Sequence, residues 1–311
     1  MSDPVVAVVG SINRDVVVEA PAFPVRGQTV AGSAVRSSIG GKGANQAVAA
    51  ALVDARVLMA ARVGDDDAGR SAVAALNADG VDTALVAVST REPTGTALIT
   101  VAENDNTIVV VAGANYDWPP GWPSGDEDAL AVLHRADVVL AQLEVPLAVV
   151  AASAAATGGR FVLNAAPAAA LPDSLLAACD VLVVNELELA VVAGSDEPTG
   201  SGRNINQAHE RVRARGVEVV VTTLGARGAL VTDASSTYEI KAPPATVVDT
   251  TGAGDAFTGV LCAKLAGGYA PAEAARWAAA AGSYAVRAAG TRASYPDAVS
   301  LGALLHEAAG P

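Results

Sequence analysis

Residues 138–163 read VVLAQLEVPLAVVAASAAATGGRFVL. Two short and wholly apolar runs, Val138–Leu140 and Phe161–Leu163, stand on either side of a helical segment, Leu147–Ala156. Continuous apolar runs are typical of strands buried on both faces, and a helix between two such strands predicts a parallel β-α-β unit. This stretch therefore indicates an α/β fold.

The same alternation continues on both sides of this stretch. Regular alternation of helix and strand predicts a doubly wound, mainly parallel sheet flanked by helices, with right-handed crossovers. The elements we predict are helices at Asp126–Arg135, Asp173–Ala178 and Asn206–Arg215, strands at Val181–Val184 and Val217–Thr222, and C-terminal helices at Gly252–Leu265, Pro271–Val286 and Asp297–Glu307.

The N-terminal part has a different character. Val5–Val9 is a continuous apolar run and predicts a buried strand, and a helical pattern follows at Ala44–Val53. Two pairs of strands alternate apolar and polar residues, which predicts one exposed face. We interpret them as a small β-sheet, a lid inserted at about 14–37 and 91–112 into a single domain spanning 1–311. The paired strands are Asp15–Ala20 with Gln28–Ser37, and Thr94–Val101 with Thr107–Ala112.

Composition narrows the possible functions. Hydrophobic residues make up 51% and charged residues 17%, so the chain can bury a large core. The formal net charge of −13 opposes binding to nucleic acid, and phosphate ligands must therefore be met by local groups. The N-terminus lacks the basic start of a signal peptide, and no apolar stretch reaches the length of a membrane span. We expect a cytoplasmic protein with no membrane or nucleic-acid partner.

The stretch Asp249-Thr250-Thr251-Gly252-Ala253-Gly254-Asp255-Ala256-Phe257 carries the strongest chemical signal. Glycines let backbone N–H groups converge on one point, and the start of a helix adds unpaired donors and a partial positive charge. Together they predict a site for phosphate or a developing anion. Asp255, in the first helical turn, is placed to accept a proton from an attacking hydroxyl. The alternative is that Asp255 only complements the helix dipole.

Polar residues also follow the predicted strands. In a doubly wound sheet, ligands bind outside the carboxyl ends of the strands. This pattern predicts an active site at that edge, and the residues in question are Asn13 and Asp15 after the first strand, Glu144, Asn185, and Thr223 with Gly225.

These motifs resemble the signatures of the ribokinase (PfkB) carbohydrate kinase family. The stretch 249–257 is similar to its C-terminal signature, and Gly40-Gly41-Lys42-Gly43-Ala44-Asn45-Gln46-Ala47 is similar to its N-terminal one. Residues 10–15 look like its sugar-binding segment, and residues 63–69 also match. The motifs keep the family's order and cover residues 5 to about 296, so the resemblance extends over nearly the whole chain.

The resemblance implies an ATP-dependent sugar kinase that phosphorylates the primary hydroxyl of a pentose, most simply D-ribose. Asp255 would be the catalytic base, and the N–H groups of Gly252, Ala253 and Gly254 would form the anion hole. The implied sugar contacts are Asn13, Asp15, Gly41, Lys42, Asn45, Glu144 and Asp255. For Lys42, a purely backbone role in the glycine-rich turn is the alternative.

The resemblance also implies nucleotide and metal sites. Asn185 and Glu188 match an Asn-x-x-Glu motif, in which Glu188 would hold Mg²⁺ through water, although Asn185 is also suited to cap a helix. The implied nucleotide contacts are Asn185, Thr223, Gly225, Gly228 and a strand end near Val247. Ala279 stands where related enzymes often have an Asn near the adenine, so the adenine contacts depart from the family pattern.

Two further expectations follow from the resemblance. A K⁺ ion would activate the enzyme, and the lid sheets of two chains would pair in a homodimer. A lid that closes over the sugar would exclude water and limit ATP hydrolysis. The implied K⁺ ligands are Asp249, Thr251, Ala285, Ala288, Gly290 and Ser294.

Other classes fit less well. A P-loop NTPase needs a hydroxyl residue after its Gly-Lys pair, whereas Gly43 follows Lys42, and the first strand lacks the Gly-x-Gly-x-x-Gly of nicotinamide enzymes. A non-catalytic sugar sensor would be expected to lack Asp255 or the glycines. Among kinases, 2-deoxyribose, a nucleoside or a hexose remain alternative acceptors, because one fold hosts many substrates.

Overall fold

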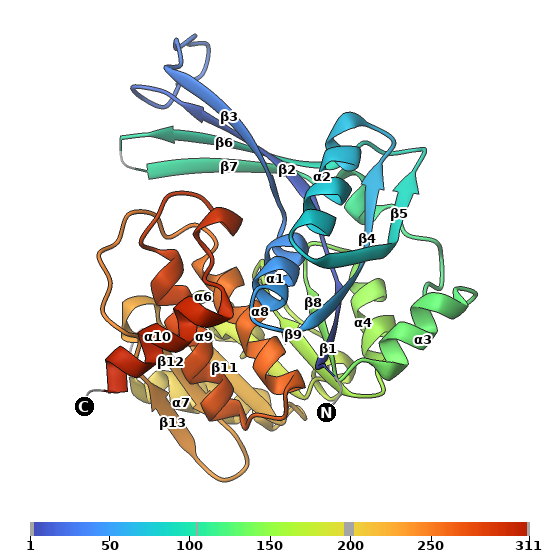
Figure 1. Ribbon diagram of the computed structural model, residues 1–311, viewed down its shortest axis with the longest axis vertical. Helices are drawn as coiled ribbons and strands as arrows, with labels where there is room; N and C mark the ends of the chain where they lie inside the picture. Colours follow the sequence, from blue (N-terminus) through green and yellow to red (C-terminus); the bar gives the residue numbers. More distant parts are fainter. Residues whose placement is uncertain (1–2, 104, 196–201, 310–311) are drawn as a thin grey trace.

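The computed structural model describes residues 3–103, 105–195 and 202–309 and contains a nine-stranded sheet (Figure 1). The strand order is β13-β12-β11-β10-β9-β8-β1-β4-β5, and all neighbours from β11 to β5 pair in parallel. The strands are β1 (Val5–Val9), β4 (Arg56–Gly64), β5 (Val81–Ser89), β8 (Val138–Gln142), β9 (Arg160–Asn164), β10 (Val181–Asn185), β11 (Val219–Thr223), β12 (Ala229–Thr232) and β13 (Thr237–Ile240).

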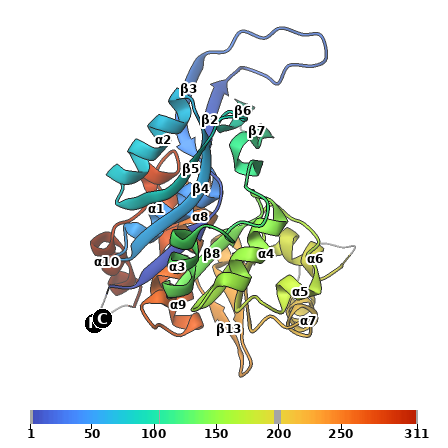
Figure 2. The same cartoon turned by 90° about the vertical axis from the view of Figure 1, so that its right-hand side faces the viewer.

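Helices cover both faces of this sheet (Figure 2). Successive strand residues face opposite sides, so Val6 and Val8 belong to one buried cluster and Ala7 and Val9 to the other. The first face carries α1 (Lys42–Ala51), α2 (Asp67–Ala78), α8 (Ala253–Ala266), α9 (Pro271–Ala285) and α10 (Ala298–Ala309). The second carries α3 (Glu127–Arg135), α4 (Leu147–Ala156), α5 (Asp173–Leu176), α6 (Glu186–Val192) and α7 (Gly202–Arg213). The predicted doubly wound architecture is confirmed.

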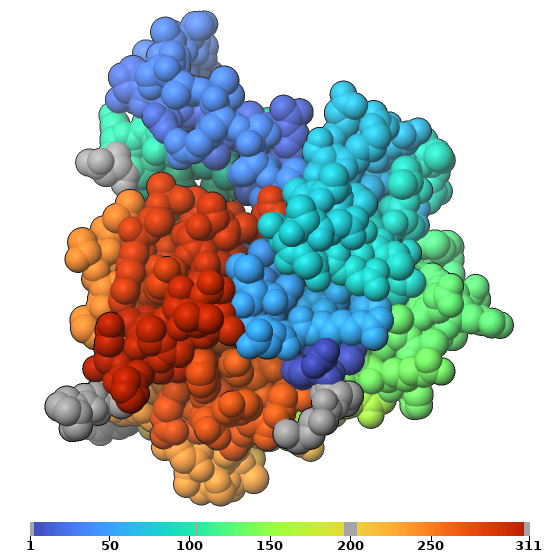
Figure 3. All heavy atoms as spheres, viewed as in Figure 1, coloured from blue at the N-terminus to red at the C-terminus, as the bar shows by residue number. Residues whose placement is uncertain are grey.

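A separate four-stranded sheet, the lid sheet, has the order β3-β2-β6-β7. Its strands are β2 (Asn13–Glu19), β3 (Ala34–Gly40), β6 (Gly95–Ala102) and β7 (Asp105–Val111). The two hairpins predicted from alternation are both present, and β2 and β6 join them in parallel. Asn104, in the turn between β6 and β7, lies outside the described residues. In Figure 3 the blue N-terminal part of the lid stands above the orange and red C-terminal helices.

Three parts of the fold differ from the prediction. The strand expected over 28–37 begins only at Ala34, and the strands β4 and β5 were not assigned from the sequence. The strand end expected near Val247 is wrong, because residues 241–252 contain no strand and Val247 is 59% exposed. The edge of the main sheet is instead an antiparallel pair, β12 and β13.

None of the helices in the described parts of the chain is both long and apolar enough to span a membrane. The parallel arrangement of β8 to β11 brings their carboxyl ends to one edge of the sheet. The lid strand β2 leaves the same edge directly after β1. The polar residues that follow these strands are therefore gathered at one place.

Candidate active site

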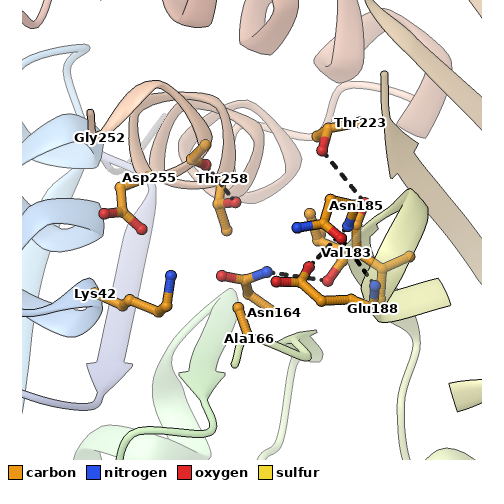
Figure 4. Close-up of a pocket in the computed structure, with 12 residues that line it drawn as sticks. Lys42, Asn164, Ala166, Val183, Asn185, Glu188, Thr223, Gly252, Asp255 and Thr258 are labelled. Carbon is orange, nitrogen blue, oxygen red and sulfur yellow. Dashed lines mark hydrogen bonds between the residues drawn. The ribbon is translucent and has the colours of Figure 1, made fainter. Parts of the chain in front are cut away.

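A pocket lies at the carboxyl edge of the sheet, between α1, α8 and the ends of β9 to β11 (Figure 4). Five of the residues predicted from the sequence to form the catalytic and nucleotide sites are among those that line it. In the view of Figure 4, Lys42 and Asp255 lie at one end and Asn185 and Glu188 at the other. The lining residues are Lys42, Asn164, Ala166, Val183, Val184, Asn185, Glu188, Thr223, Gly252, Gly254, Asp255 and Thr258.

Asp255 is a buried carboxylate in the first turn of α8, with 9% of its surface exposed. Asn45 Nδ2 donates to its Oδ2 at 3.0 Å, and Gln46 Nε2 donates to its Oδ1 at 2.9 Å. Burial raises the pKa of Asp255, while Lys42 and the two amides oppose this shift. The carboxylate therefore combines limited hydration with fixed donors, the environment in which a carboxylate can serve as a general base.

The start of α8 supplies backbone donors. Gly252 has a φ of 77° in the left-handed region, and an added Cβ would lie 2.8 Å from Tyr295 Oη, so only glycine fits this turn. Within the described residues, the N–H groups of Gly252 and Gly254 have no protein acceptor, and both residues line the pocket. The Ala253 N–H donates to Thr250 O at 3.3 Å. Two of the three donors of the predicted anion hole are thus free to bind an anion.

Lys42 begins α1 and extends its ammonium group into the pocket (Figure 4). Burial lowers the pKa of Lys42, but the carboxylates of Asp255, Glu144 and Glu188 outweigh this effect and leave the pKa raised. The side chain therefore stays cationic beside three carboxylates. The Lys42 side chain therefore brings a positive charge into the pocket, in addition to its place in the backbone turn.

Glu144 and Gly41 shape the turn that leads into α1. Glu144 Oε2 accepts hydrogen bonds from the Lys42 N–H at 3.0 Å and from Ser11 Oγ. Gly41 has a φ of 91°, and an added Cβ would lie 2.9 Å from the Ser11 carbonyl oxygen. Glu144 therefore connects the end of β8 to α1, and the backbone at position 41 requires glycine.

Asn13 and Asp15 lie on β2, where the lid sheet leaves the body. Asn13 Oδ1 accepts a hydrogen bond from Asn115 Nδ2 at 2.7 Å. The Asp15 carboxylate packs over Gly40, where a Cβ would come within 2.0 Å of Asp15 Oδ2. Burial, followed by the charges of Glu144 and Asp255, raises the pKa of Asp15 to about 6. The structure thus gathers the predicted sugar-binding carboxylates close enough to repel one another.

Asn185 and Glu188 form a capping box at the start of α6. Asn185 Oδ1 accepts from the Glu188 N–H, and Glu188 Oε2 accepts from the Asn185 N–H, both at 2.8 Å. Burial raises the pKa of Glu188, the Asn185 bond and Lys42 oppose the shift, and the Asp255 charge adds to it. The expected capping role is real, and it directs the Glu188 carboxylate into the pocket (Figure 4).

Only one of the other three predicted nucleotide contacts lines the pocket. Thr223 ends β11 and lines the pocket, whereas Gly225 and Gly228 belong to the turn between β11 and β12 and do not line it. An added Cβ at Gly228 would lie 1.9 Å from Ile240 O, so this glycine is required by the packing of β13. Ala279 is buried in α9.

The predicted K⁺ ligands come from two loops that contact each other. Asp249 accepts hydrogen bonds from the N–H groups of Thr251 and Gly290, both at 2.9 Å, and Ser294 Oγ donates to Gly290 O at 3.0 Å. Burial alone would raise the pKa of Asp249, but these donors leave it below its ordinary value. Ala285 ends α9 and Ala288 lies in the bend that follows.

Sequence reasoning missed several polar residues of the site. Gln46 contacts Asp255, Gln142 contacts Gln46 and Asn164 lines the pocket. Gln142 and Asn164 end β8 and β9, so the strand-end pattern used for Asn185 could have found them. Gln46 stands inside the quoted N-terminal motif, but nothing in its spacing indicates a partner in α8.

Known proteins resemble this chain over almost its full length. The model of the pfkB family carbohydrate kinases matches residues 3–298. A ribokinase of Haemophilus influenzae is 36% identical over 293 residues, which are 93% of this chain and 94% of the relative. A deoxyribokinase of Salmonella typhi is 32% identical over 297 residues, 94% of this chain and 95% of the relative.

The solved structures agree with the sequence relatives. The structure of Arabidopsis thaliana ribokinase complexed with ribose and ATP has a TM-score of 0.91 to this chain, at 34% identity. The alignment covers 98% of this chain and 99% of that chain. The likeness therefore includes the lid sheet as well as the main sheet.

Proposed function

This chain belongs to the pfkB family of carbohydrate kinases, and from that premise we propose that it transfers the γ-phosphoryl group of ATP to the 5-hydroxyl of D-ribose. The observation that carries the proposal is the buried Asp255 carboxylate beside the free N–H groups of Gly252 and Gly254. A base and a set of anion donors at one point are the minimum that phosphoryl transfer requires. The solved relative that binds ribose and ATP supports this pair of substrates.

In the proposed reaction, an Asp255 oxygen accepts the proton of the 5-hydroxyl as that oxygen attacks the γ-phosphorus. The new O–P bond forms while the bond to the bridging oxygen of ATP breaks, and ADP leaves. The N–H groups of Gly252 and Gly254 donate to the phosphoryl oxygens as their charge redistributes. Lys42, held cationic by three carboxylates, offsets charge at the same end of the pocket.

The sugar would lie between the lid strand β2 and the start of α1. Asn13, Asp15, Asn45 and Glu144 offer amide and carboxylate groups, each of which can bridge hydroxyls of a polyol. The Asn45 Oδ1 atom is buried and has no partner in the described protein, so it is free to accept from a ligand. Gly41 allows the backbone to approach closely. These residues favour a polyhydroxylated ligand over an apolar one.

The residues of the pocket fit a divalent cation. Glu188 and Asp255 are both carboxylates whose pKa values burial raises, and the charge of Asp255 adds to the rise at Glu188. Mg²⁺ prefers oxygen ligands and keeps several waters, so Glu188 and Asn185 would hold it through water beside the phosphates. When bound, Mg²⁺ would neutralise charge on the phosphate oxygens.

The Asp249 cluster offers only oxygen ligands to a cation. One carboxylate, the Ser294 hydroxyl and backbone carbonyls of the 249–251 and 285–290 segments are of the kind that coordinates K⁺. The cluster adjoins Gly252, so we propose that K⁺ stabilises the loop that presents the anion hole. ADP release measured with and without K⁺ tests this step.

A homodimer through the lid is supported by one face of the lid sheet. The register places Val16, Leu98 and Val109 side by side, and Val35, Leu98, Val109 and Val111 are each at least 49% exposed. A contiguous exposed apolar surface of this kind marks an interaction site. We propose that a second copy of the lid covers it.

The cytoplasmic location stays a prediction.

A substrate panel tests the choice of acceptor. ADP release would be measured with Mg-ATP and D-ribose, 2-deoxyribose, adenosine or fructose, and the phosphorylated position would be assigned by ³¹P NMR. We expect the highest kcat/KM with D-ribose and phosphate on the 5-oxygen. Preference for 2-deoxyribose would instead indicate a kinase with the acceptor of the deoxyribokinase relative. Inactivity with every acceptor would favour the sugar-sensor alternative.

A further inference from the structure

A chain of buried amides leads from the main sheet to Asp255. Gln46 Nε2 donates to Asp255 Oδ1 and to Asn164 Oδ1, both at 2.9 Å. Gln142 Nε2 donates to Gln46 Oε1 at 2.7 Å. Gln46 and Gln142 are fully buried. Both amide hydrogens and the oxygen of Gln46 are therefore in use, and none of them faces solvent.

A backbone carbonyl sets which group donates and which accepts in this series of hydrogen-bonded amides. Asn164 Nδ2 donates to Val183 O at 3.1 Å, and a carbonyl oxygen can only accept. Asn164 must therefore present its oxygen to Gln46, and Gln46 must present N–H groups to both Asn164 and Asp255. Gln142 completes the arrangement by donating to the remaining oxygen of Gln46. As a result, Asp255 faces a fixed donor.

We propose that Gln46 is a positioning residue that fixes the orientation of the Asp255 carboxylate and favours its ionised form. The ends of three neighbouring strands, β8, β9 and β10, hold Gln46 through Gln142, Asn164 and Val183. Asn45 also donates to Asp255, but its oxygen has no partner among the described residues, so Asn45 is not held as Gln46 is. The inference rests on the proposed role of Asp255 as the base.

The proposal predicts a specific kinetic signature. Gln46→Met keeps an unbranched side chain of similar length and removes both donors. Loss of the donor leaves the carboxylate less well oriented, and misplacement of a reacting group can cost about 10- to 100-fold in kcat. Because a hydrogen bond to the charged form lowers a carboxyl pKa, the acid limb of the kcat–pH profile should move to higher pH. KM for the sugar should stay within about twofold, since uniform binding is not affected.

Two companion variants separate positioning from general damage. Gln142→Met removes the donor to Gln46 Oε1 without touching Asp255, and it should lower kcat less than Gln46→Met while moving the acid limb in the same direction. Val48 lies on the same helix, is 1% exposed and belongs to the buried apolar cluster, so Val48→Ala is the control. It should lower thermal stability and leave kcat and the pH profile at wild-type values.

The experiment measures kcat, KM and the pH profile of the three variants, with Asp255→Asn in the same series. A folded Gln46→Met with wild-type kcat and an unmoved acid limb would overturn the inference, and so would a change confined to KM. If Gln46→Met does not fold, the pH profile of folded Gln142→Met decides in the same way. Wild-type turnover by Asp255→Asn would instead refute the proposed base.

Discussion

The buried charge of Asp15 is expected to lower the free energy of unfolding, although the same charge is proposed to bind the sugar. Its carboxyl pKa rises from the ordinary 3.8 to about 6, because of burial first and then the charges of Glu144 and Asp255. At 1.36 kcal/mol per pKa unit, ionising Asp15 in the native state costs about 3 kcal/mol more than in the unfolded chain. Asp15→Asn keeps the shape and removes this charge.

The pH dependence gives the sign of the effect. Between pH 4 and 6 the native protein binds more protons at Asp15 than the unfolded chain does, so the contribution to stability falls as pH rises through this range. In urea unfolding at pH 7.5, Asp15→Asn should raise the free energy of unfolding by up to about 3 kcal/mol. At pH 4.5 the difference should shrink to about 1 kcal/mol, because native Asp15 is then protonated while unfolded Asp15 is still mostly ionised. Below about pH 3 the difference should vanish, because Asp15 is protonated in both states.

The assay has a functional arm and a control. A charged acceptor binds hydroxyls more strongly than a neutral amide, so Asp15→Asn should raise KM for ribose by about tenfold or more. Glu92→Gln alters an exposed carboxyl before β6 and should change stability by less than about 0.5 kcal/mol. Equal stability of Asp15→Asn and wild type at pH 7.5, or a gain that does not depend on pH, would refute the reasoning.

Two further predictions concern stability and assembly. His209 is buried between the hydroxyls of Thr222 and Thr232, and burial, with a smaller effect of Arg213, lowers its pKa to about 4. The stability due to neutral His209 should be fully present above pH 6.5 and fall by about 3 kcal/mol as pH decreases towards 4. Unfolding of His209→Gln against pH should therefore show a flatter acid slope than wild type, whereas equal slopes would contradict this. Leu98→Asp on the lid should give a monomer by light scattering, whereas Val88→Asp, at an exposed position of β5, should keep the wild-type mass. An unchanged mass for Leu98→Asp would exclude a lid dimer.

The doubly wound, mainly parallel architecture could be predicted because the central strands, such as β1, β8 and β10, are buried on both faces. The helix at Leu147–Ala156 has the predicted bounds, since Pro146 and Thr157 delimit an alanine-rich run. The strand expected near Val247 was wrong because this apolar segment is exposed rather than buried in the sheet. Val247 and Val248 form an apolar pair, but both are about 60% exposed and pair with no strand. Local apolarity cannot show whether a partner strand lies alongside.

The site could be predicted residue by residue only where a motif carried it. Asp255 and Lys42 stand in short motifs and line one pocket, as expected. Gln46 was not predicted because its proposed role depends on Asp255, which is 209 residues away in the chain. It also depends on the hydrogen-bond direction that the Val183 carbonyl imposes through Asn164. Gly228 was predicted to contact nucleotide, yet its positive φ and the proximity of Ile240 explain it structurally. Contacts between residues so far apart in the chain produce no local sequence pattern from which they could be predicted.

The central claim is that Asp255 is the base of an ATP-dependent sugar kinase. The most direct measurement is ADP release with Mg-ATP and D-ribose, with and without K⁺, for the wild type and Asp255→Asn. The account predicts ribose-dependent turnover that K⁺ raises, and a kcat at least about 100-fold lower in Asp255→Asn, with its fold intact by circular dichroism. Wild-type turnover by the folded Asn variant, or ADP release that does not depend on a sugar, would contradict it.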